Sequence, residues 1–408
     1  MDRPFRLEGF DLRRYRVGPL APHIDGLAAL LSAGQYRRES ARQKIRVVAD
    51  LSLWLERRRL GADALDEQVV RRFFHRRHRH DQVRAGDVSA AAVVLELLRE
   101  RGVVPRSSTE ADPRHAVEKD FERYLREERR LSQASLDNTL PFVRRFLSDR
   151  FGGGAVALQE LHPSDVTRFV LRSIDGMSPS RAKLLVGALR SFFRFVRMRD
   201  EIATDLAGAV PTVADWRLSS VPKGIDPDDV RRLLRSCDRR TATGRRDYAI
   251  LLLLARLGLR SGEVASLTLE DIDWEAAEMV IHGKGPRVDR LPLPRDVGAA
   301  LVAYLCRRPV CTMREVFVTA RAPIQKLARG TVGYVVERAM ARTNLDAPHK
   351  GAHVLRHTLA IDMLRRGASL PEIGELLRHR RLDTTAIYAK VDLGALRALA
   401  LPWPGGAE

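Results

Sequence analysis

Residues 249–259, AILLLLARLGL, restrict the fold of this chain more than any other stretch. The run is almost wholly apolar, yet it is shorter than the roughly 20 residues that a membrane-spanning helix needs, and it contains Arg256. A segment that is apolar on every side is typical of a helix at the centre of a globular domain. We therefore expect a buried central helix here, in a domain that does not enter a membrane.

Helical periodicity continues through most of the chain, and links that contain glycine or proline separate the periodic segments. At 408 residues the chain is long enough for two or three domains. We expect a helical N-terminal region over residues 1–112, a helical domain over 113–208, a linker over 209–224 and a last domain over 225–408. Only residues 278–294 have the composition of two strands around a Gly-Lys-Gly turn, so the predicted fold is mainly α with a small β-sheet (α+β).

Two parts of the helical sequence resemble each other. A helix, a glycine-containing link, a helix with an acidic start and aromatic residues, and a helix rich in alanine and leucine follow in the same order near residues 36–102 and 115–200. LDEQVVRRFFHRR in the first part corresponds to LHPSDVTRFVLRS in the second, where Ser164 is the predicted N-cap. We interpret this as a weak internal repeat; the alternative is a coincidence of helical patterning.

The charge balance favours a polyanionic partner. The chain has 71 basic and 52 acidic residues and a net charge of +19, although an arginine-rich composition accounts for part of this excess. Its three cysteines lack metal-ligand spacing, and no cluster of cysteines or carboxylates accompanies the HRRHRH run. The start, MDRPFRLEGF, has no apolar signal segment. We therefore expect no metal and no cofactor in a cytoplasmic, nucleoid-associated protein.

The stretch from residue 352 to 390 combines several polar residues that can act on phosphate. His353, Arg356 and His357 are spaced i, i+3 and i+4, so they share one face of a predicted helix that ends near Gly367. Ser369 and Glu372 then form a capping-box pattern that opens a second helix. The chain continues to His379 and, after Thr384 and Thr385, to Tyr388.

These side-chain types suit phosphodiester chemistry. A guanidinium binds two phosphate oxygens through its planar fork, and an imidazole donates hydrogen bonds or moves protons near neutral pH. A phenol attacks only where its surroundings favour loss of the proton, because its ordinary pKa is about 10. The alternative is a basic helical surface with an incidental tyrosine, and the downstream HRRLDTTAIY disfavours it.

HVLRH followed by LLRHRRLDTTAIYAK resembles the second signature of the tyrosine recombinases, the phage integrase family. The upstream RLGLRSGE resembles the first signature of that family, and Lys284 lies in the predicted β-hairpin. The resemblance implies a catalytic set of Arg260, Lys284, His353, Arg356, His379 and Tyr388. One residue departs from the pattern, because Arg378 stands where the family usually has glycine.

The resemblance also implies a mechanism. Tyr388 would attack a phosphate of duplex DNA, form a 3′-phosphotyrosyl bond and release a 5′ hydroxyl, while Lys284 would protonate the leaving oxygen. Two residues, Glu263 and His357, would support the site, with Glu263 orienting a basic group or simply capping its own helix. Residues 113–208 would be the core-binding domain of the family, with the basic residues Arg144, Arg181, Lys183 and Arg190 facing DNA.

The resemblance leaves several alternatives open. The N-terminal region would be a divergent core-binding module, an arm-site reader or a contact for sister recombinases. The family implies a tetramer on DNA, with residues 393–401 docked on a neighbouring protomer. The protein would integrate or transpose a mobile element; the alternatives are a chromosome-dimer resolvase, a relaxing topoisomerase of type IB and a DNA-binding regulator without catalysis.

Overall fold

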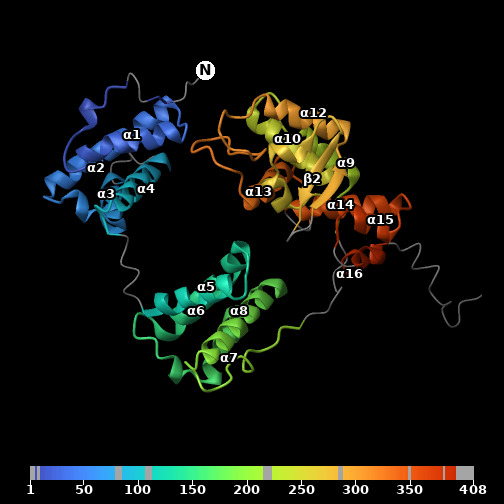
Figure 1. Ribbon diagram of the computed structural model, residues 1–408, viewed down its shortest axis with the longest axis horizontal. Helices are drawn as coiled ribbons and strands as arrows, with labels where there is room; N and C mark the ends of the chain where they lie inside the picture. The colour runs from blue at the N-terminus through green and yellow to red at the C-terminus, as the bar shows by residue number, and fades with distance from the viewer. Residues whose placement is uncertain are drawn as a thin grey trace, which may run out of the picture. The chain divides into compact units, whose positions relative to one another are not determined.

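The computed structural model describes residues 5–6, 10–78, 85–105, 113–214, 223–283, 288–347, 351–379 and 382–391. The fold is mainly helical and contains a three-stranded sheet, so the predicted fold class is confirmed (Figure 1). By contacts along the backbone the chain divides into two compact units, one of residues 53–83 and 91–217 and the other of residues 1–52, 84–90 and 218–408.

The N-terminal region contains four α-helices among its described residues. These are α1 (Ile24–Ala33), α2 (Arg38–Arg57), α3 (Glu67–His78) and α4 (Ala85–Glu100), with the short 3-10 helices η1 (Arg13–Tyr15), η2 (Ala21–His23) and η3 (Ala62–Ala64) between or before them. The Ser52 hydroxyl ties α2 to the segment before α1, since it donates to the carbonyl of Val17 at 2.5 Å and accepts from the amide of Leu20 at 2.9 Å.

The next helices are α5 (Pro113–Glu127), α6 (Gln133–Phe151), η5 (Leu158–Glu160), α7 (Pro163–Ile174) and α8 (Pro179–Met198). Their core is aromatic: the ring of Phe146 meets the rings of Phe169 and Phe193 edge to face, with centroids 5.2 and 5.3 Å apart. Val210 belongs to this core, two residues beyond the boundary expected at 208. The predicted N-cap at Ser164 is wrong, because Pro163 fixes the first helical position and His162 caps α7.

The buried positions of two helix pairs, α2 with α6 and α4 with α8, follow one repeat. Residues 41, 45, 47, 48, 51 and 52 of α2 are buried, and so is the residue 95 positions after each of them in α6, from Leu136 to Leu147. The same separation of 95 joins buried residues 87, 90, 91, 94, 97 and 98 of α4 to buried residues of α8, from Ala182 to Phe193. The agreement over two long helices supports the predicted internal repeat.

Residues 223–391 are built around α10 (Ala242–Arg256), the predicted central helix. Its residues from Ala249 to Leu254 are at most 2% exposed, which confirms that prediction. The surrounding elements are α9 (Pro227–Arg235), α11 (Ser261–Ser266), η6 (Leu269–Asp271), α12 (Arg295–Leu305), α13 (Arg329–Arg342), α14 (Ala352–Arg365), α15 (Leu370–Leu376), α16 (Leu382–Thr385) and η7 (Ala386–Val391). Helices α12, α13 and α14 all pack on α10 (Figure 1).

The sheet beside these helices is antiparallel, with strand order β1 (Ile272–Asp273), β2 (Glu278–His282) and β3 (Val288–Pro292). Met279 of β2 pairs with Ile272 and Leu291, and these three side chains cover the core. The predicted hairpin is therefore present, but Lys284, in its connection, lies outside the described residues, as do residues 393–401. Within the described ranges, no helix is long and apolar enough to cross a membrane.

Candidate functional site

The candidate site forms where three segments meet: the link between α10 and α11, the helix α14, and the segment from α15 to η7. Gly258 makes this meeting possible. Its φ of +57° is in the left-handed region, and a Cβ there would lie 2.7 Å from Cδ2 of Leu377. A larger residue would have a strained backbone and would displace the side chain of Leu377, so glycine suits the place where the two predicted signatures meet.

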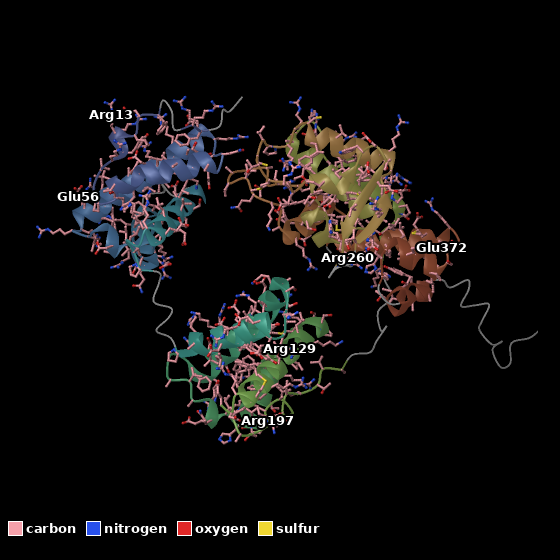
Figure 2. All side chains as sticks on the ribbon, in the orientation of Figure 1. Arg13, Glu56, Arg129, Arg197, Arg260 and Glu372 are labelled. Carbon is pink, nitrogen blue, oxygen red and sulfur yellow. The ribbon has the colours of Figure 1, made fainter. Side chains whose placement is uncertain are left out.

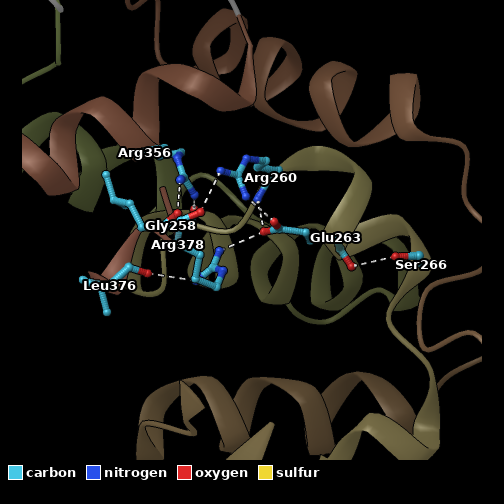
Figure 3. Close-up of polar contacts among 8 residues, drawn as sticks. Gly258, Arg260, Glu263, Ser266, Arg356, Leu376 and Arg378 are labelled. Carbon is cyan, nitrogen blue, oxygen red and sulfur yellow. Dashed lines mark hydrogen bonds and ion pairs between the residues drawn. The ribbon is translucent and has the colours of Figure 1, made fainter. Parts of the chain in front are cut away.

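Arg260 lies two residues after Gly258, as the N-cap of α11, and its side chain is 39% exposed. The carboxylate of Glu263 accepts from the Arg260 backbone amide at 2.8 Å and from its Nη1 at 2.6 Å (Figure 3). Glu263 therefore does both things considered for it, because it caps α11 and orients a basic group. Arg260 also donates from Nη2 to the carbonyl of Arg378 at 3.3 Å.

Arg356 comes from the buried face of α14 and is only 3% exposed. Its Nη1 donates to the carbonyl of Gly258 and its Nη2 donates to the carbonyl of Leu377, as Figure 3 shows. Desolvation, aided by the charge of Arg260, lowers the pKa of Arg356 to about 10, so the side chain stays charged at neutral pH. The guanidinium thus joins the three segments and leaves further N–H donors for a ligand.

Tyr388 lies in η7 and is 1% exposed. Its hydroxyl is 2.8 Å from Nδ1 of His357, which lies on α14. Burial raises the pKa of Tyr388 to about 12, against the opposing charge of Arg356. The phenol is therefore neutral at pH 7 in this structure, and it reaches the α14 face within its own chain.

The two remaining histidines differ in their environment. His353 is exposed, and partial desolvation together with Arg356 lowers its pKa. His379 is half-buried, and desolvation followed by the charge of Arg356 lowers its pKa to about 4. Its Nδ1 lies 2.8 Å from the hydroxyl of Thr385, and its ring is parallel to that of Tyr388 with centroids 6.5 Å apart. His379 is therefore a neutral hydrogen-bonding group at pH 7.

The turn between α15 and α16 contains a site residue that the sequence reasoning missed. Arg378 has a φ of +54° and is 4% exposed. Its Nη2 donates to Oε2 of Glu263 at 2.8 Å and its Nη1 donates to the carbonyl of Leu376 at 2.9 Å. The sequence did contain a sign of this role, because Arg378 stands directly before His379, where the resembled family has glycine.

Of the four residues predicted to face DNA, Arg144 and Arg181 are exposed, and Lys183 and Arg190 are half-buried. Arg144 pairs with Glu118 through its Nε at 3.0 Å and through its Nη2. Arg190 donates to the carbonyl of Val210 at 2.9 Å. Arg181 is exposed and lies over the ring of Phe142, and Lys183 is half-buried and also has a partner.

A hollow of about 670 Å³ beside α8 contains the predicted Arg190 and two further arginines that were not predicted. Arg190, Arg194 and Arg197 line it together with Asp205 and the segment 207–208, and Figure 2 labels Arg197. The three arginines lie at i, i+4 and i+7 of α8, so they face the same way. One of them, Arg197, pairs with Asp205 through its Nη1 at 3.3 Å. Among the residues that the structure describes, no cluster of three or more His, Cys, Asp or Glu offers a metal site.

Comparison with known proteins agrees with this arrangement. The pattern of the phage integrase family matches residues 223–393. Two proteins of Sinorhizobium fredii, named as integrase/recombinase y4rA and y4rF, are 45% identical over 404 residues and 34% identical over 405 residues. These matches cover 98% of this chain and 98% of y4rA, and 97% of this chain and 94% of y4rF.

Solved structures show the same fold at low sequence identity. The XerH site-specific recombinase bound to its difH substrate is 20% identical, with a TM-score of 0.53 over 69% of this chain and 83% of XerH. A lambda integrase dimer bound to a COC′ core site is 15% identical, with a TM-score of 0.53 over 78% of this chain and 89% of that one. The chain belongs to the phage integrase family of tyrosine recombinases, enzymes that recombine DNA at specific sites.

Proposed function

We propose that this protein cuts and rejoins duplex DNA by transesterification, with Tyr388 as the nucleophile. The observation that carries the proposal is the position of the Tyr388 hydroxyl, 2.8 Å from His357 and in the electrostatic field of Arg356, all within one chain. A phenol, imidazoles and guanidiniums from separate segments come together at one site. That combination supplies a nucleophile, proton acceptors and cations for a phosphate.

The proposed reaction conserves the phosphodiester bond energy. The Tyr388 oxygen bonds to the scissile phosphorus, the bond from phosphorus to the 5′ oxygen breaks, and a 3′-phosphotyrosyl link results. The Tyr388 proton passes to Nδ1 of His357 or to the solvent, and the departing 5′ oxygen takes a proton from Lys284. Attack of a new 5′ hydroxyl on the link reverses these steps and needs no ATP. Proton transfers of this kind each contribute roughly 10²–10⁴-fold.

Arg260 and Arg356 bind the non-bridging oxygens in this proposal. Arg260 is the more exposed of the two, so it meets the phosphate first. Arg356 is held by two backbone carbonyls and adds a charge that cannot move away when charge develops on the phosphate. His353 and His379 complete the hydrogen-bonding set; the low pKa of His379 favours its neutral form.

Duplex DNA is the proposed partner, and α5–α8 is the proposed core-binding domain. The basic hollow of Arg190, Arg194 and Arg197 supports this, together with the exposed Arg181. In this proposal the core-binding and catalytic domains close around a duplex. A tetramer on DNA, with the C-terminal tail of one protomer docked on its neighbour, and integration or transposition of a mobile element complete the proposal. The integrase/recombinase names of the y4r relatives support the last point.

A nicked duplex that traps the covalent intermediate tests the proposal. Wild-type protein is expected to form an adduct on such a substrate, while Tyr388→Phe binds the same DNA and forms none. Adduct formation by Tyr388→Phe, or none by wild type on any duplex of a randomised library, would contradict the assignment of the nucleophile. A substrate with two sites separates recombination from relaxation, because a topoisomerase rejoins only the original strand. A regulator without catalysis would bind and never form the adduct.

A further inference from the structure

Arg378 combines two unfavourable features. Its φ of +54° lies in the left-handed region, where a residue with a Cβ is strained. Its guanidinium is 3% exposed and has therefore lost its hydration. Glycine would remove both features at once. An arginine in this place is consequently explained by what its charge does rather than by the stability of the turn.

Two contacts of Arg378, one from its side chain and one from its backbone, lead to Arg260. Nη2 of Arg378 and the backbone amide of Arg260 share Oε2 of Glu263, each at 2.8 Å, while Oε1 accepts from Nη1 of Arg260 at 2.6 Å. The carbonyl of Arg378 accepts from Nη2 of Arg260 at 3.3 Å. Figure 3 shows Glu263 lying between the two guanidiniums. Side chain and backbone of Arg378 therefore both fix the orientation of Arg260.

The charges in this group explain why a second cation is needed. Glu263 is buried, and desolvation alone would raise its pKa, yet the amide of Arg260 and the charge of Arg378 keep the pKa below its ordinary value. The carboxylate is thus ionised. With Arg260 as its only partner it would neutralise the guanidinium that has to meet the phosphate. With Arg378 beside it, the group of two arginines and one glutamate keeps a net positive charge.

We propose that Arg378 is a positioning residue that balances Glu263 and so keeps the charge and orientation of Arg260 available for the scissile phosphate. It replaces the turn glycine of the resembled family with a charged residue. Arg378 acts through Arg260 rather than on the phosphate itself, because its guanidinium is already bound to Glu263 and to the carbonyl of Leu376. The inference rests on the proposed function, since it assigns a role within that reaction.

Two variants of similar shape separate charge from packing. Arg378→Lys and Arg378→Met both carry an unbranched side chain and the same backbone strain, but only lysine keeps the cation. Using the full chain, we expect single-turnover adduct formation at saturating nicked duplex to be about 10- to 100-fold slower for Arg378→Met than for Arg378→Lys, a size typical of coupled residues. The dissociation constant for DNA should agree within about twofold between them, since surface cations outside the site supply most of the binding.

A double variant tests the role of the carboxylate. Glu263→Gln removes the charge that Arg378 balances, so Arg378→Met combined with Glu263→Gln should lose much less than the product of the two single losses. Arg366→Gly serves as a control for Arg378→Gly, because it makes the same change at the exposed end of α14. Arg366→Gly should cleave within about twofold of wild type, whereas Arg378→Gly should be slow even with an unfolding midpoint close to that of wild type.

The outcomes distinguish this inference from the proposed function. Equal cleavage rates for Arg378→Lys and Arg378→Met, or losses that multiply in the double variant, would overturn the role of Arg378 and leave the recombinase intact. A wild-type protein without any adduct would instead overturn the proposed function. Because the lysine and methionine variants share the same packing and strain, a purely structural role predicts equal losses in both.

Discussion

The candidate site and the α5–α8 helices use arginine in opposite ways. Arg356 and Arg378 are almost completely buried, and they bind backbone carbonyls or a carboxylate. Arg144, Arg172 and Arg197 of the helical bundle have side chains that are 58%, 61% and 52% exposed. A buried charge is poorly screened and cannot reorient, whereas an exposed one is screened by salt and moves freely. Replacement of an arginine in the site should therefore change the rate of cleavage, and replacement of an arginine in the α5–α8 helices should change the affinity for DNA.

Replacement of Arg356 should give the largest effect. Arg356→Ala leaves the carbonyls of Gly258 and Leu377 without their donor and removes a fixed cation. We expect adduct formation to fall by roughly 10²–10³ and the free energy of unfolding to fall by about 2–4 kcal/mol. The same measurements on Arg172→Ala, which breaks an exposed pair with Asp149, should change stability by less than about 1 kcal/mol. Comparable losses in both variants would remove the contrast between the regions.

Replacement of His357 should have the second-largest effect on the rate of cleavage. His357→Ala removes the hydrogen-bonding partner of Tyr388, and we expect cleavage at pH 7 to slow by about 10²-fold. The loss should shrink as the pH rises toward the Tyr388 pKa of about 12, because the phenol then ionises without help. His357→Asn keeps an acceptor near the Nδ1 position and should recover the orientation of Tyr388 but not the proton transfer. A pH-independent loss would show that His357 only orients the tyrosine.

The buried site should also respond to acid. The pKa of His379 is lowered to about 4 from an ordinary value of 6.5, so the folded protein binds this proton less well than the unfolded chain. Above pH 6.5, His379 is neutral in both states and does not lower the free energy of unfolding. Between pH 6.5 and 4 the unfolded chain binds this proton and the folded protein does not, so the free energy of unfolding falls. We expect a loss of about 1–3 kcal/mol across this window. Thermal unfolding of His379→Asn should lack this part of the acid sensitivity; an unchanged profile would assign it to other groups.

The bundle arginines should give the smallest effect on chemistry. The double change Arg194→Ala and Arg197→Ala should weaken DNA binding and reduce the slope of log affinity against log salt by about one for each phosphate that the variant no longer neutralises. Cleavage at saturating DNA should stay within about twofold of wild type, because exposed charges act through occupancy. A slower rate at saturation would place these residues in the chemistry and weaken the distinction drawn above.

The sequence predicted the elements whose signals are local. Ser369 and Glu372 form the expected capping box, with the Ser369 amide donating to the carboxylate at 2.7 Å. The apolar run around Leu252 is central and buried, since only a core position tolerates such a surface. The prediction of Ser164 as an N-cap was wrong because α7 begins one residue earlier, at Pro163, whose fixed φ suits the first helical position.

Long-range contacts were harder to predict. The partner of Arg378 lies 115 residues earlier in the chain, and no periodicity connects the two positions. Tyr388 was expected near the arginines and His357 was expected to support the site, but the contact between these two residues was not predicted. The basic face of α8 was only partly found, because charged residues occur on all exposed helix faces and their grouping becomes visible only when the burial of each helix is known.

The repeat of buried positions over 95 residues has a consequence for how this protein can be altered. Because buried positions 95 residues apart correspond, the exposed positions between them correspond as well, and their residues can be exchanged one for one. Arg194 corresponds to Arg99, but the positions that match Arg190 and Arg197 hold Leu95 and Gly102, so the α1–α4 helices do not copy the α8 cationic row. The two sets of helices can therefore differ in their surface residues while their cores stay alike. A chimera that carries the surface residues of one set on the core of the other should keep its fold and change its binding partner.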